Sequence, residues 1–313
     1  MTYSKLANRA ATRSVLEDHG LEAKYQLGQN FLVDDGVVGD ICELADLQPD
    51  DAVLEVGPGI GTLTCALLPR CSALVAVEAD RDMQGPLAFS TADYSERFAL
   101  VLDDATRVQP SALESALAGL YSRSAAYRRD PSDPDARPLR RLPNRWVSNL
   151  PYAVAATLVL RYFEQWDFIE DAVVMVQSEV ADRICADPGS KIYGAYTLKL
   201  RLYARVVGRV QVPARSFYPA PHVESAVVRL ERLPESERLA SEEAREVASV
   251  VDAAFAQRRK TIRNSMSAAK RWTKERLDAA FEACGIDPAA RAETFDLPTF
   301  VALTRALRDQ GGR

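Results

Sequence analysis

The sequence feature that most constrains the fold is a short apolar run followed at once by three closely spaced glycines. Residues 52–56 have the composition of a buried strand, residues 57–61 read Gly-Pro-Gly-Ile-Gly, and residues 62–68 have the composition of a helix. A strand, a glycine loop and a helix in this order predict the first unit of an open, Rossmann-like α/β sheet. The spacing is G-x-G-x-G, whereas a dinucleotide site favours G-x-G-x-x-G. Gly57 and Gly59 are therefore expected to let the backbone approach another ligand closely, and a tight turn without a ligand is the alternative.

Acidic residues close the next two predicted strands. Glu78 ends the strand at residues 74–78, at the distance past the glycines where an acid normally holds the ribose hydroxyls of an adenosine ligand. A solvated carboxylate is the alternative interpretation. Asp103 and Asp104 end the strand at residues 100–102, and either could accept a hydrogen bond from the amino group of an adenine; the spacing does not decide between them.

The stretch Ser-Asn-Leu-Pro-Tyr at residues 148–152 lies between a predicted strand and a predicted helix. An exocyclic amine on a nucleobase is a poor nucleophile because its lone pair is delocalised into the ring. The amide oxygen of Asn149 and a backbone carbonyl near Leu150 or Pro151 could each accept one amino proton and direct the lone pair towards a methyl sulfonium. Pro151 also fixes φ and removes a competing N–H. Tyr152 offers a flat face to a flipped base. An ordinary turn is the alternative.

Two further segments are candidates for the same site. Residues 24–32 are predicted to be a loop, whose Asn30 and Leu32 would face a ligand only if the segment folds over the cofactor pocket. Phe217 lies in a loop that two prolines stiffen, and it could form the second face of a base sandwich with Tyr152. A plain core aromatic is a nearly equal alternative for Phe217.

The length and the apolar pattern predict two domains. A chain of 313 residues is long enough for one large α/β domain and a smaller one. A polar stretch at residues 234–237 is followed by helical apolar spacing to the end of the chain. We therefore predict an α/β domain at residues 1–234, with a helical N-terminal extension, and a small all-helical domain at residues 235–313. Apart from a possible helical stub at its start, the stretch at residues 119–144, rich in Arg, Pro, Ser and Asp, is expected to form a long surface loop before the fourth strand.

Composition limits the compartment and the metal chemistry. The five cysteines form no C-x-x-C pair and only two histidines are present, so neither a disulfide framework nor a zinc site is expected. No apolar run reaches the roughly 18 residues of a membrane span, and residues 1–20 lack a signal-peptide core. We expect a cytoplasmic protein.

A cluster of basic residues near the start of the predicted helical domain points to nucleic acid. Residues 258–276 hold eight positive side chains and one negative side chain, Glu275. The net charge of −5 argues mildly against a nucleic-acid partner, but the local pattern carries more weight. RNA phosphate contacts are predicted for four of these side chains, Arg258, Arg259, Lys260 and Arg263. A solvated helix face is the alternative.

Taken in order, these motifs resemble the ribosomal small-subunit (16S) RNA adenine N6,N6-dimethyltransferase family. The resemblance runs from about residue 24 to the C-terminus. It rests on residues 27–32 (LGQNFL), 55–59 (EVGPG), Glu78, 104–105 (DA), 149–152 (NLPY), Phe217 with Pro219 and Pro221, and the run QRRKT to NS at residues 257–265. Each motif alone is weak, but together and in this order they are highly specific.

The resemblance implies the fold, the cofactor and the reaction. The fold would be that of a class I S-adenosylmethionine methyltransferase, an α/β fold with a seven-stranded, mainly parallel sheet that has one antiparallel strand, and a helical C-terminal domain. Cofactor contacts would come from Asn30, Leu32, Gly57, Gly59, Glu78, Asp104 and Asn149. The family dimethylates the exocyclic amines of two adjacent adenosines in a hairpin near the 3′ end of small-subunit RNA. The expected partner is an immature 30S subunit, and we expect a monomer that uses neither metal nor membrane.

The chain departs from the family pattern at three places. Asp103 stands where a small or amide residue commonly precedes the acid, and His222 stands where Lys is common. The insertion at residues 119–144 is longer than expected. The last two departures bear on substrate docking rather than on the proposed chemistry.

Three alternative functions stay open. A related methyltransferase family that acts on large-subunit RNA and confers macrolide resistance usually has Ile where this chain has Leu150, and the motif at residues 258–265 also argues against it. A non-catalytic RNA-binding assembly or transcription factor with the same fold is disfavoured by the intact Asn149–Tyr152 stretch and by Glu78. An NAD-dependent oxidoreductase is disfavoured by the glycine spacing.

Overall fold

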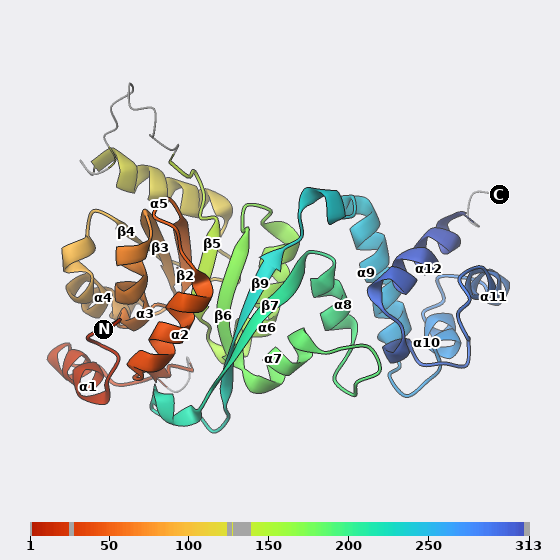
Figure 1. The fold of residues 1–313 in the computed structure, drawn as a ribbon, viewed down its shortest axis with the longest axis horizontal. Coiled ribbons are helices and arrows are strands. Elements are labelled where there is room, and N and C mark those ends of the chain that lie inside the picture. Colours follow the sequence, from red (N-terminus) through yellow and green to blue (C-terminus); the bar gives the residue numbers. More distant parts are fainter. Residues whose placement is uncertain (1, 25–27, 124–126, 128–138, 310–313) are drawn as a thin grey trace. The chain divides into compact units, whose positions relative to one another are not determined.

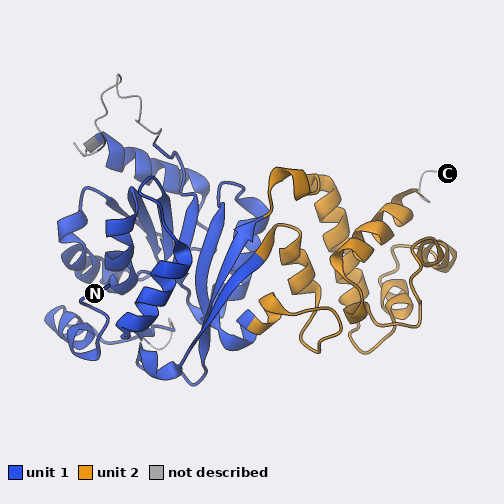
Figure 2. Cartoon of the chain, viewed as in Figure 1, with its two compact units in different colours: residues 1–181, 206–232 blue, residues 182–205, 233–313 orange. Residues whose placement is uncertain are grey.

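The computed structural model describes residues 2–24, 28–123, 127 and 139–309. The chain folds into two compact units, Met1–Ala181 with Val206–Arg232, and Asp182–Arg205 with Leu233–Arg313 (Figure 2). The second unit resumes at Leu233, two residues before the predicted start at residue 235. It also takes in residues 182–205, which the sequence analysis assigned to the first domain. These residues belong there because Leu198 and Leu202 share a hydrophobic core with Val250.

The first unit is built on a seven-stranded sheet in the order β4-β3-β2-β5-β6-β9-β7 (Figure 1). The strands are β2 (Ala52–Val56), β3 (Ala73–Glu78), β4 (Phe98–Leu102), β5 (Arg145–Asn149), β6 (Asp171–Gln177), β7 (Ala204–Val212) and β9 (Ser225–Arg232). The pairs from β4 to β6 are all parallel, and β9 runs antiparallel to β6. The predicted fold class is confirmed.

Helices cover both faces of this sheet (Figure 1). They are α2 (Asp35–Ala45), α3 (Thr62–Leu67), α4 (Gln84–Ser90), α5 (Pro110–Arg123), α6 (Tyr152–Gln165) and α7 (Ser178–Cys185). Ile41 of α2 packs in one core with Val147 of β5. Trp146 points to the opposite face because side chains alternate along a strand. There its ring lies 4.7 Å from that of Tyr162 in α6.

A small second sheet ties the N-terminal segment to the loop before β9. β1 (Phe31–Leu32) pairs antiparallel with β8 (Phe217–Tyr218). The helix α1 (Arg9–Asp18) packs its Val15 and Leu16 into a cluster with Phe31. Segments nearly 200 residues apart in the chain therefore lie side by side.

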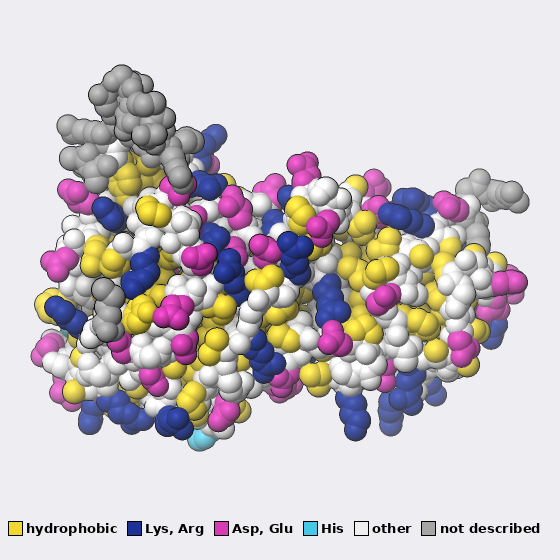
Figure 3. All heavy atoms as spheres, viewed as in Figure 1, with side chains coloured by type: hydrophobic (Ala, Val, Ile, Leu, Met, Phe, Trp, Pro, Cys, Tyr) yellow, Lys and Arg dark blue, Asp and Glu magenta, His cyan; other side chains and the backbone are white. Residues whose placement is uncertain are grey.

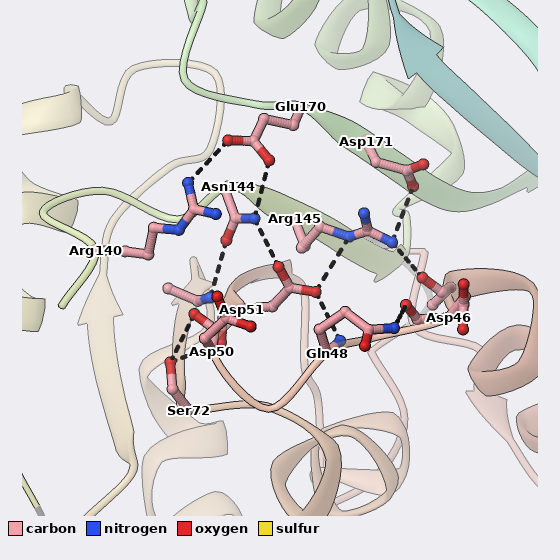
Figure 4. A network of polar contacts seen from close by, with 12 residues as sticks. Asp46, Gln48, Asp50, Asp51, Ser72, Arg140, Asn144, Arg145, Glu170 and Asp171 are labelled. Atoms are coloured by element: carbon pink, nitrogen blue, oxygen red, sulfur yellow. Dashed lines mark hydrogen bonds and ion pairs between the residues drawn. The ribbon is translucent and has the colours of Figure 1, made fainter. Parts of the chain in front are cut away.

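A buried polar network closes the amino ends of the central strands. Asn144 exchanges backbone and side-chain hydrogen bonds with Ala52, both of 2.9 Å. Its Nδ2 atom donates to Asp51 at 2.7 Å and to Glu170 at 3.2 Å (Figure 4). These groups satisfy one another, so this network is structural, and ligands of open α/β sheets bind at the opposite, carboxyl ends of the strands.

The second unit is mainly helical, and among its described residues only Ala204 and Arg205, the first two positions of β7, lie in a strand. It contains α8 (Ala195–Arg201), α9 (Ser241–Phe255), α10 (Ile262–Ala268), α11 (Lys274–Ala283) and α12 (Leu297–Asp309), around one hydrophobic core. Short 3-10 turns complete the chain: η2 (Leu68–Arg70), η3 (Arg81–Met83), η4 (Ala92–Tyr94), η6 (Ala214–Ser216), η7 (Glu235–Glu237) and η8 (Ala292–Thr294). Among the described residues, no helix combines the length and the apolar composition needed to cross a membrane.

One secondary-structure prediction is wrong. The helical pattern at residues 196–206 predicts one helix, but α8 ends at Arg201 and β7 begins at Ala204. Residues 210–213 (Val-Gln-Val-Pro) predict a separate short strand, but they are the end of β7, which stops at Val212. Val206 and Val207 are β-branched, and pairing beside β9 decides their conformation.

Candidate active site

The glycine loop and the Asn149–Tyr152 turn lie against each other. Gly57 and Gly59 have φ angles of 70° and 57°, in the left-handed region that favours glycine. A Cβ atom on Gly57 would lie 3.4 Å from the Pro151 ring and 3.8 Å from the Asn149 carbonyl oxygen. The two motifs that stand about 90 residues apart in the sequence therefore form one surface at the carboxyl ends of β2 and β5.

Glu78 faces the same loop from the end of β3. Its side chain is buried, and its Oε2 accepts a hydrogen bond of 3.3 Å from the Gly59 N–H while its Oε1 accepts one of 2.8 Å from the Asp80 N–H. Burial raises the pKa of Glu78, and these two hydrogen bonds partly offset the rise. The carboxylate is therefore held in place beside the glycine loop, where the predicted ribose site lies.

A clamp centred on Asp80 fastens the N-terminal segment next to Glu78. Lys24 Nζ lies 2.7 Å from one oxygen of Asp80, and Gln29 Nε2 donates to the other at 2.8 Å. Burial raises the pKa of Asp80, but the hydrogen bonds from Lys24, the Asp82 N–H and Gln29 bring it below its ordinary value. Sequence reasoning missed this clamp, because Lys24 and Gln29 lie more than 50 residues from Asp80 in the chain. The presence of an acid two residues after Glu78 does not by itself indicate such contacts. Leu27 of the LGQNFL motif lies outside the described residues.

The amide of Asn149 is oriented by the backbone of Asn30. Asn149 Nδ2 donates a hydrogen bond of 3.3 Å to the Asn30 carbonyl oxygen. Because a carbonyl can only accept, the amide nitrogen must face Asn30, and the Asn149 Oδ1 atom is left as an acceptor. The side chain of Asn30 itself donates to the Gly28 carbonyl at 3.0 Å. Asn30 therefore contributes to the site through its main chain, and the N-terminal segment does fold over the sheet edge.

The structure distinguishes the two backbone carbonyls that the sequence left open. The Pro151 carbonyl accepts hydrogen bonds from the Val154 and Ala155 N–H groups, both at 3.1 Å, and so begins α6. Within the described part of the chain, the Leu150 carbonyl accepts no hydrogen bond, although the Leu150 N–H donates to Met175 at 3.1 Å. The Leu150 carbonyl is therefore the free acceptor beside Asn149.

The hydroxyl of Ser225 fixes Tyr152 at the start of α6. The Tyr152 and Ser225 hydroxyl oxygens lie 2.6 Å apart, and the tyrosine ring is half-buried. Burial raises the pKa of Tyr152, so the phenol stays protonated near neutral pH. Ser225, at the first position of β9, is a contact that sequence reasoning did not identify.

Two predicted site residues are core residues. Phe217 has 0% of its side chain exposed and Leu32 has 3%, and both belong to the cluster that also contains Val38 and Ile41. Phe217 therefore presents no face to a base in this structure, which favours the core alternative over the base sandwich with Tyr152. Leu32 can reach a ligand only through its backbone.

Of the two acids after β4, Asp104 has the side chain that is held by more hydrogen bonds. Its Oδ1 accepts hydrogen bonds from the Thr106 hydroxyl at 2.7 Å and the Thr106 N–H at 2.8 Å. These bonds lower the pKa of Asp104. Both acids are exposed, but among the described residues the side chain of Asp103 accepts a hydrogen bond only from the neighbouring Asp104 N–H, at 2.7 Å. Asp104 is thus held as an ionised carboxylate, whose oxygens can only accept and so suit an adenine amino group.

Glu55, two residues before the glycine loop, could suit a positively charged sulfonium by its position in the sequence, but in the structure it does not present a charge. It is 1% exposed, and its Oε2 accepts a hydrogen bond of 2.7 Å from the Thr64 hydroxyl. Burial raises the pKa of Glu55 to about 8. The side chain is therefore mostly neutral at pH 7, and its contact with Thr64 links β2 to α3.

We expect the variant Glu55→Gln to lose much of the pH dependence of stability. The folded pKa of about 8 lies above the ordinary value of 4.5, so the folded state binds the extra proton between these values. The free energy of unfolding of the natural protein should therefore fall as pH rises through this window, by on the order of 1.4 kcal/mol per pH unit from this group alone. Urea unfolding of the natural protein and of Glu55→Gln from pH 5 to 9 measures the difference in their free energies of unfolding. If these free energies changed with pH in parallel, the prediction would be contradicted.

The basic motif at residues 257–265 divides into a structural part and an exposed part. The Ser265 hydroxyl is buried, accepts the Gln257 N–H at 3.0 Å and donates to the Ala253 carbonyl at 2.9 Å. Thr261 caps α10 through the Asn264 N–H. These contacts shape the loop that carries three exposed cations, Arg258, Arg259 and Lys260.

Arg263 does not share that exposed position. Its guanidinium contacts both carboxylate oxygens of Asp278, at 2.6 and 2.5 Å, and the pair raises the pKa of Arg263. A guanidinium already occupied by a carboxylate in this bidentate geometry is a poor phosphate ligand. The prediction that Arg263 binds RNA is therefore not supported, because the helices of the second unit bring Asp278 to it.

A pocket of about 450 Å³ lies away from these residues. It opens at the amino ends of β2, β3 and β4, and it is lined by Leu47, Pro49, Asp50, Pro69, Arg70, Cys71, Ser72, Arg97, Tyr127 and Leu139. It contains none of the predicted site residues. Ligands of open α/β sheets bind at the opposite, carboxyl ends of the strands.

Most of the chain is similar to known ribosomal RNA methyltransferases. Residues 20–307 match the model of the family described as ribosomal RNA adenine dimethylase. A protein of Acidothermus cellulolyticus named ribosomal RNA small subunit methyltransferase A is 38% identical over 302 residues, which cover 95% of this chain and 93% of that protein.

Solved structures share the fold. A dimethyladenosine transferase from Plasmodium falciparum superposes with a TM-score of 0.69 at 21% identity, over 90% of this chain and 98% of that one. The 23S rRNA methyltransferase ErmE superposes with a TM-score of 0.63 at 24% identity, over 89% of this chain and 100% of that one. At such identities the likeness establishes the architecture alone.

Proposed function

The chain belongs to the ribosomal RNA adenine dimethylase family, and from this premise we propose that it dimethylates two adjacent adenosines near the 3′ end of small-subunit ribosomal RNA. The observation that carries the proposal is the pair of free acceptors at the end of β5. Asn149 Oδ1 is left open by the contact with Asn30, and the Leu150 carbonyl is left open by the start of α6. The name of the 38% identical relative supports the small subunit as the source of the RNA.

The residues around these acceptors fit S-adenosylmethionine. Gly57 provides a backbone surface that a Cβ atom would fill, Glu78 is a fixed acceptor for the ribose hydroxyls, and Asp104 is an ionised acceptor for the adenine amino group. When bound, S-adenosylmethionine supplies a methyl group activated by a positively charged sulfur, which keeps the electron pair of the broken bond.

The chain's own residues prepare the amine. Tyr152 stacks against the flipped adenine, and its ring is held by Ser225. In the first transfer Asn149 Oδ1 and the Leu150 carbonyl each accept one amino hydrogen, which pulls the nitrogen out of conjugation and directs its lone pair. The ammonium product then loses one proton to water, and in the second transfer one of the two oxygens accepts the single hydrogen that remains. The same two oxygens then face the positive charge that develops on the nitrogen. Because the ammonium product is acidic, no side chain has to act as a strong base, and positioning carries the rate.

Function is tested by adding the protein and S-adenosylmethionine to separated ribosomal subunits and to immature small subunits that lack the modification. We expect two adjacent dimethylated adenosines in the small-subunit RNA, located by primer extension. Methylation of the large subunit instead would favour the macrolide-resistance type of enzyme. Binding of the cofactor without transfer to any of these particles would favour a non-catalytic assembly factor.

The exposed cations of the second unit provide a separate prediction. We expect the triple variant Arg258→Ala, Arg259→Ala, Lys260→Ala to bind small-subunit RNA more weakly, with a log–log salt dependence shallower by about one for each phosphate that it no longer binds. The exposed Arg245 on α9 serves as the control, because Arg245→Ala removes a charge from the same unit outside this loop. Filter binding from 50 to 300 mM KCl measures the RNA affinity and its salt dependence for both variants. Equal log–log slopes for the triple variant and the natural protein would contradict the prediction.

A further inference from the structure

We infer that the N-terminal helix α1 is part of the RNA-binding surface of the catalytic unit, an inference that rests on the proposed function. Its Arg9 and Arg13, together with Arg215 of η6, form a positively charged group that we call the α1 rim. The family model matches from residue 20, so α1 lies outside the matched region. The occupant of the rim would be the phosphate backbone that flanks the flipped adenosine.

The α1 rim is joined to the candidate site by direct contacts. Arg9 Nη2 donates a hydrogen bond of 3.5 Å to the Arg215 carbonyl, and the Arg13 guanidinium lies 5.8 Å from the centre of the Tyr218 ring. Tyr218 pairs with Phe31 in the small sheet, and Phe31 follows Asn30, whose carbonyl orients Asn149. A short series of contacts, from Arg13 through Tyr218 to Phe31 and Asn30, therefore connects the rim to Asn149.

Hydrophobic packing fixes α1 in this place. Val15 and Leu16 of α1 share a buried cluster with Phe31 of β1 and with Ile60 of the glycine loop. Asn8 caps the start of the helix by accepting a hydrogen bond from the Ala11 N–H. The arginines are thus presented by an ordered helix that is packed on the glycine loop.

The charges of the rim are available to a ligand. All three arginines are exposed, and among the described residues none of them makes an ion pair. Figure 3 shows Lys and Arg side chains gathered along the lower left edge, over α1 and the neighbouring η6 segment. The chain as a whole has a net charge of −5, so the three exposed arginines beside the candidate site form a local region of positive charge.

The helix dipole does not explain the distribution of charge along α1. Arg9 and Arg13 lie in the first half of α1, whereas Glu17 and Asp18 lie in its last turn. The helix dipole favours the reverse order, with acids at the start and bases at the end. A phosphate ligand explains the arrangement, because the positive end of the dipole and the arginines attract the same anion.

The geometry of the reaction brings phosphates to this place. An adenosine flipped into the site remains linked to the phosphates on both of its sides, so the RNA backbone must cross the edge of the pocket. Contacts of arginine with phosphate fix the position of the strand without reading its sequence. The α1 rim would therefore position the substrate, and it would not take part in the chemistry.

The test is the double variant Arg9→Ala, Arg13→Ala, in which alanine preserves the helix. We expect the KM for unmodified small-subunit RNA to rise several-fold and the log–log salt dependence of binding to become shallower by about two, one for each arginine. The kcat at saturating RNA and the affinity for S-adenosylmethionine should not change. The variant Arg9→Lys, Arg13→Lys should restore most of the salt dependence, since it keeps both charges.

The control is Arg97→Ala, which removes an exposed arginine at the amino end of β4, the opposite edge of the sheet. A double alanine variant with the KM and salt slope of the natural protein would overturn the inference. So would a loss of binding that is equal at all salt concentrations and that the lysine variant does not reverse. If the natural protein methylates no ribosomal RNA, the proposed function fails, whereas filter binding of the RNA still reports on the rim by itself.

Discussion

Replacing Asn149 by alanine is expected to lower the single-turnover rate of methyl transfer by about 100- to 1000-fold, the usual effect of removing one preorganised polar group from a reacting centre. Asn149 Oδ1 is directed into the site because the amide nitrogen is bound to the Asn30 carbonyl. Alanine leaves the Leu150 carbonyl as the single acceptor, so the amine keeps more of its conjugation with the ring.

The matched control is an asparagine at the other end of the same strand. Asn144 immediately precedes β5 and serves the buried network around Asp51 and Glu170. Asn144→Ala should lower the free energy of unfolding by about 1–3 kcal/mol, the cost of unsatisfied buried partners, without a comparable loss in the rate of the folded protein. Rapid-quench assays with unmodified small subunits measure both variants. An undiminished rate in Asn149→Ala would show that the acceptor role is wrong.

Replacing Glu78 by alanine is expected to weaken S-adenosylmethionine binding by about 100-fold or more, since hydrogen bonds to a charged group contribute about 1.5–3 kcal/mol each and the ribose would lose two. The same change removes the acceptor for the Gly59 and Asp80 N–H groups, so the glycine loop would also be held less firmly. Isothermal titration calorimetry with the cofactor measures the dissociation constant directly.

A nearby exposed acid provides the control for that measurement. Asp82 pairs with Lys24 at 2.5 Å, and its side chain is 57% exposed. A surface ion pair contributes about 0–1 kcal/mol, so Asp82→Ala should change the dissociation constant by less than about fivefold. Equal effects of the two variants would indicate that Glu78 acts only through general charge and does not hold the ribose.

Much of the fold was predictable from short segments. The alternation of apolar residues, the three glycines and the turn residues act over distances of a few positions, and they are visible in residues 52–68 without knowledge of the rest of the chain. An open parallel sheet and the places of Gly57, Glu78 and Asn149 at its carboxyl edge follow from local patterns of this kind, because parallel strands joined by helices end on the same side. The number of seven strands, with one antiparallel, was implied by the family resemblance and not by these patterns.

Other features depended on partners that the sequence does not bring together. Phe217 resembles a base-stacking residue in its loop, yet it is covered by residues from β1 and α2. Arg263 resembles a phosphate ligand in its basic run, yet Asp278 on the next helix occupies it. Residues 182–205 follow α6 and β6 in order, yet their apolar side chains complete the core of the second unit.

The sequence by itself therefore determined which residue types stand at the ends of which strands, because strand, loop and helix preferences are local. Only the tertiary structure decided which of those groups are free. Among the described residues, the Leu150 carbonyl is open and the Pro151 carbonyl is not, Glu55 is mostly neutral at pH 7 and Asp104 is charged, and Arg9 has no ion pair whereas Arg263 has one. The physical reason is that hydrogen bonding, burial and ion pairing depend on distances between groups that are often far apart along the chain.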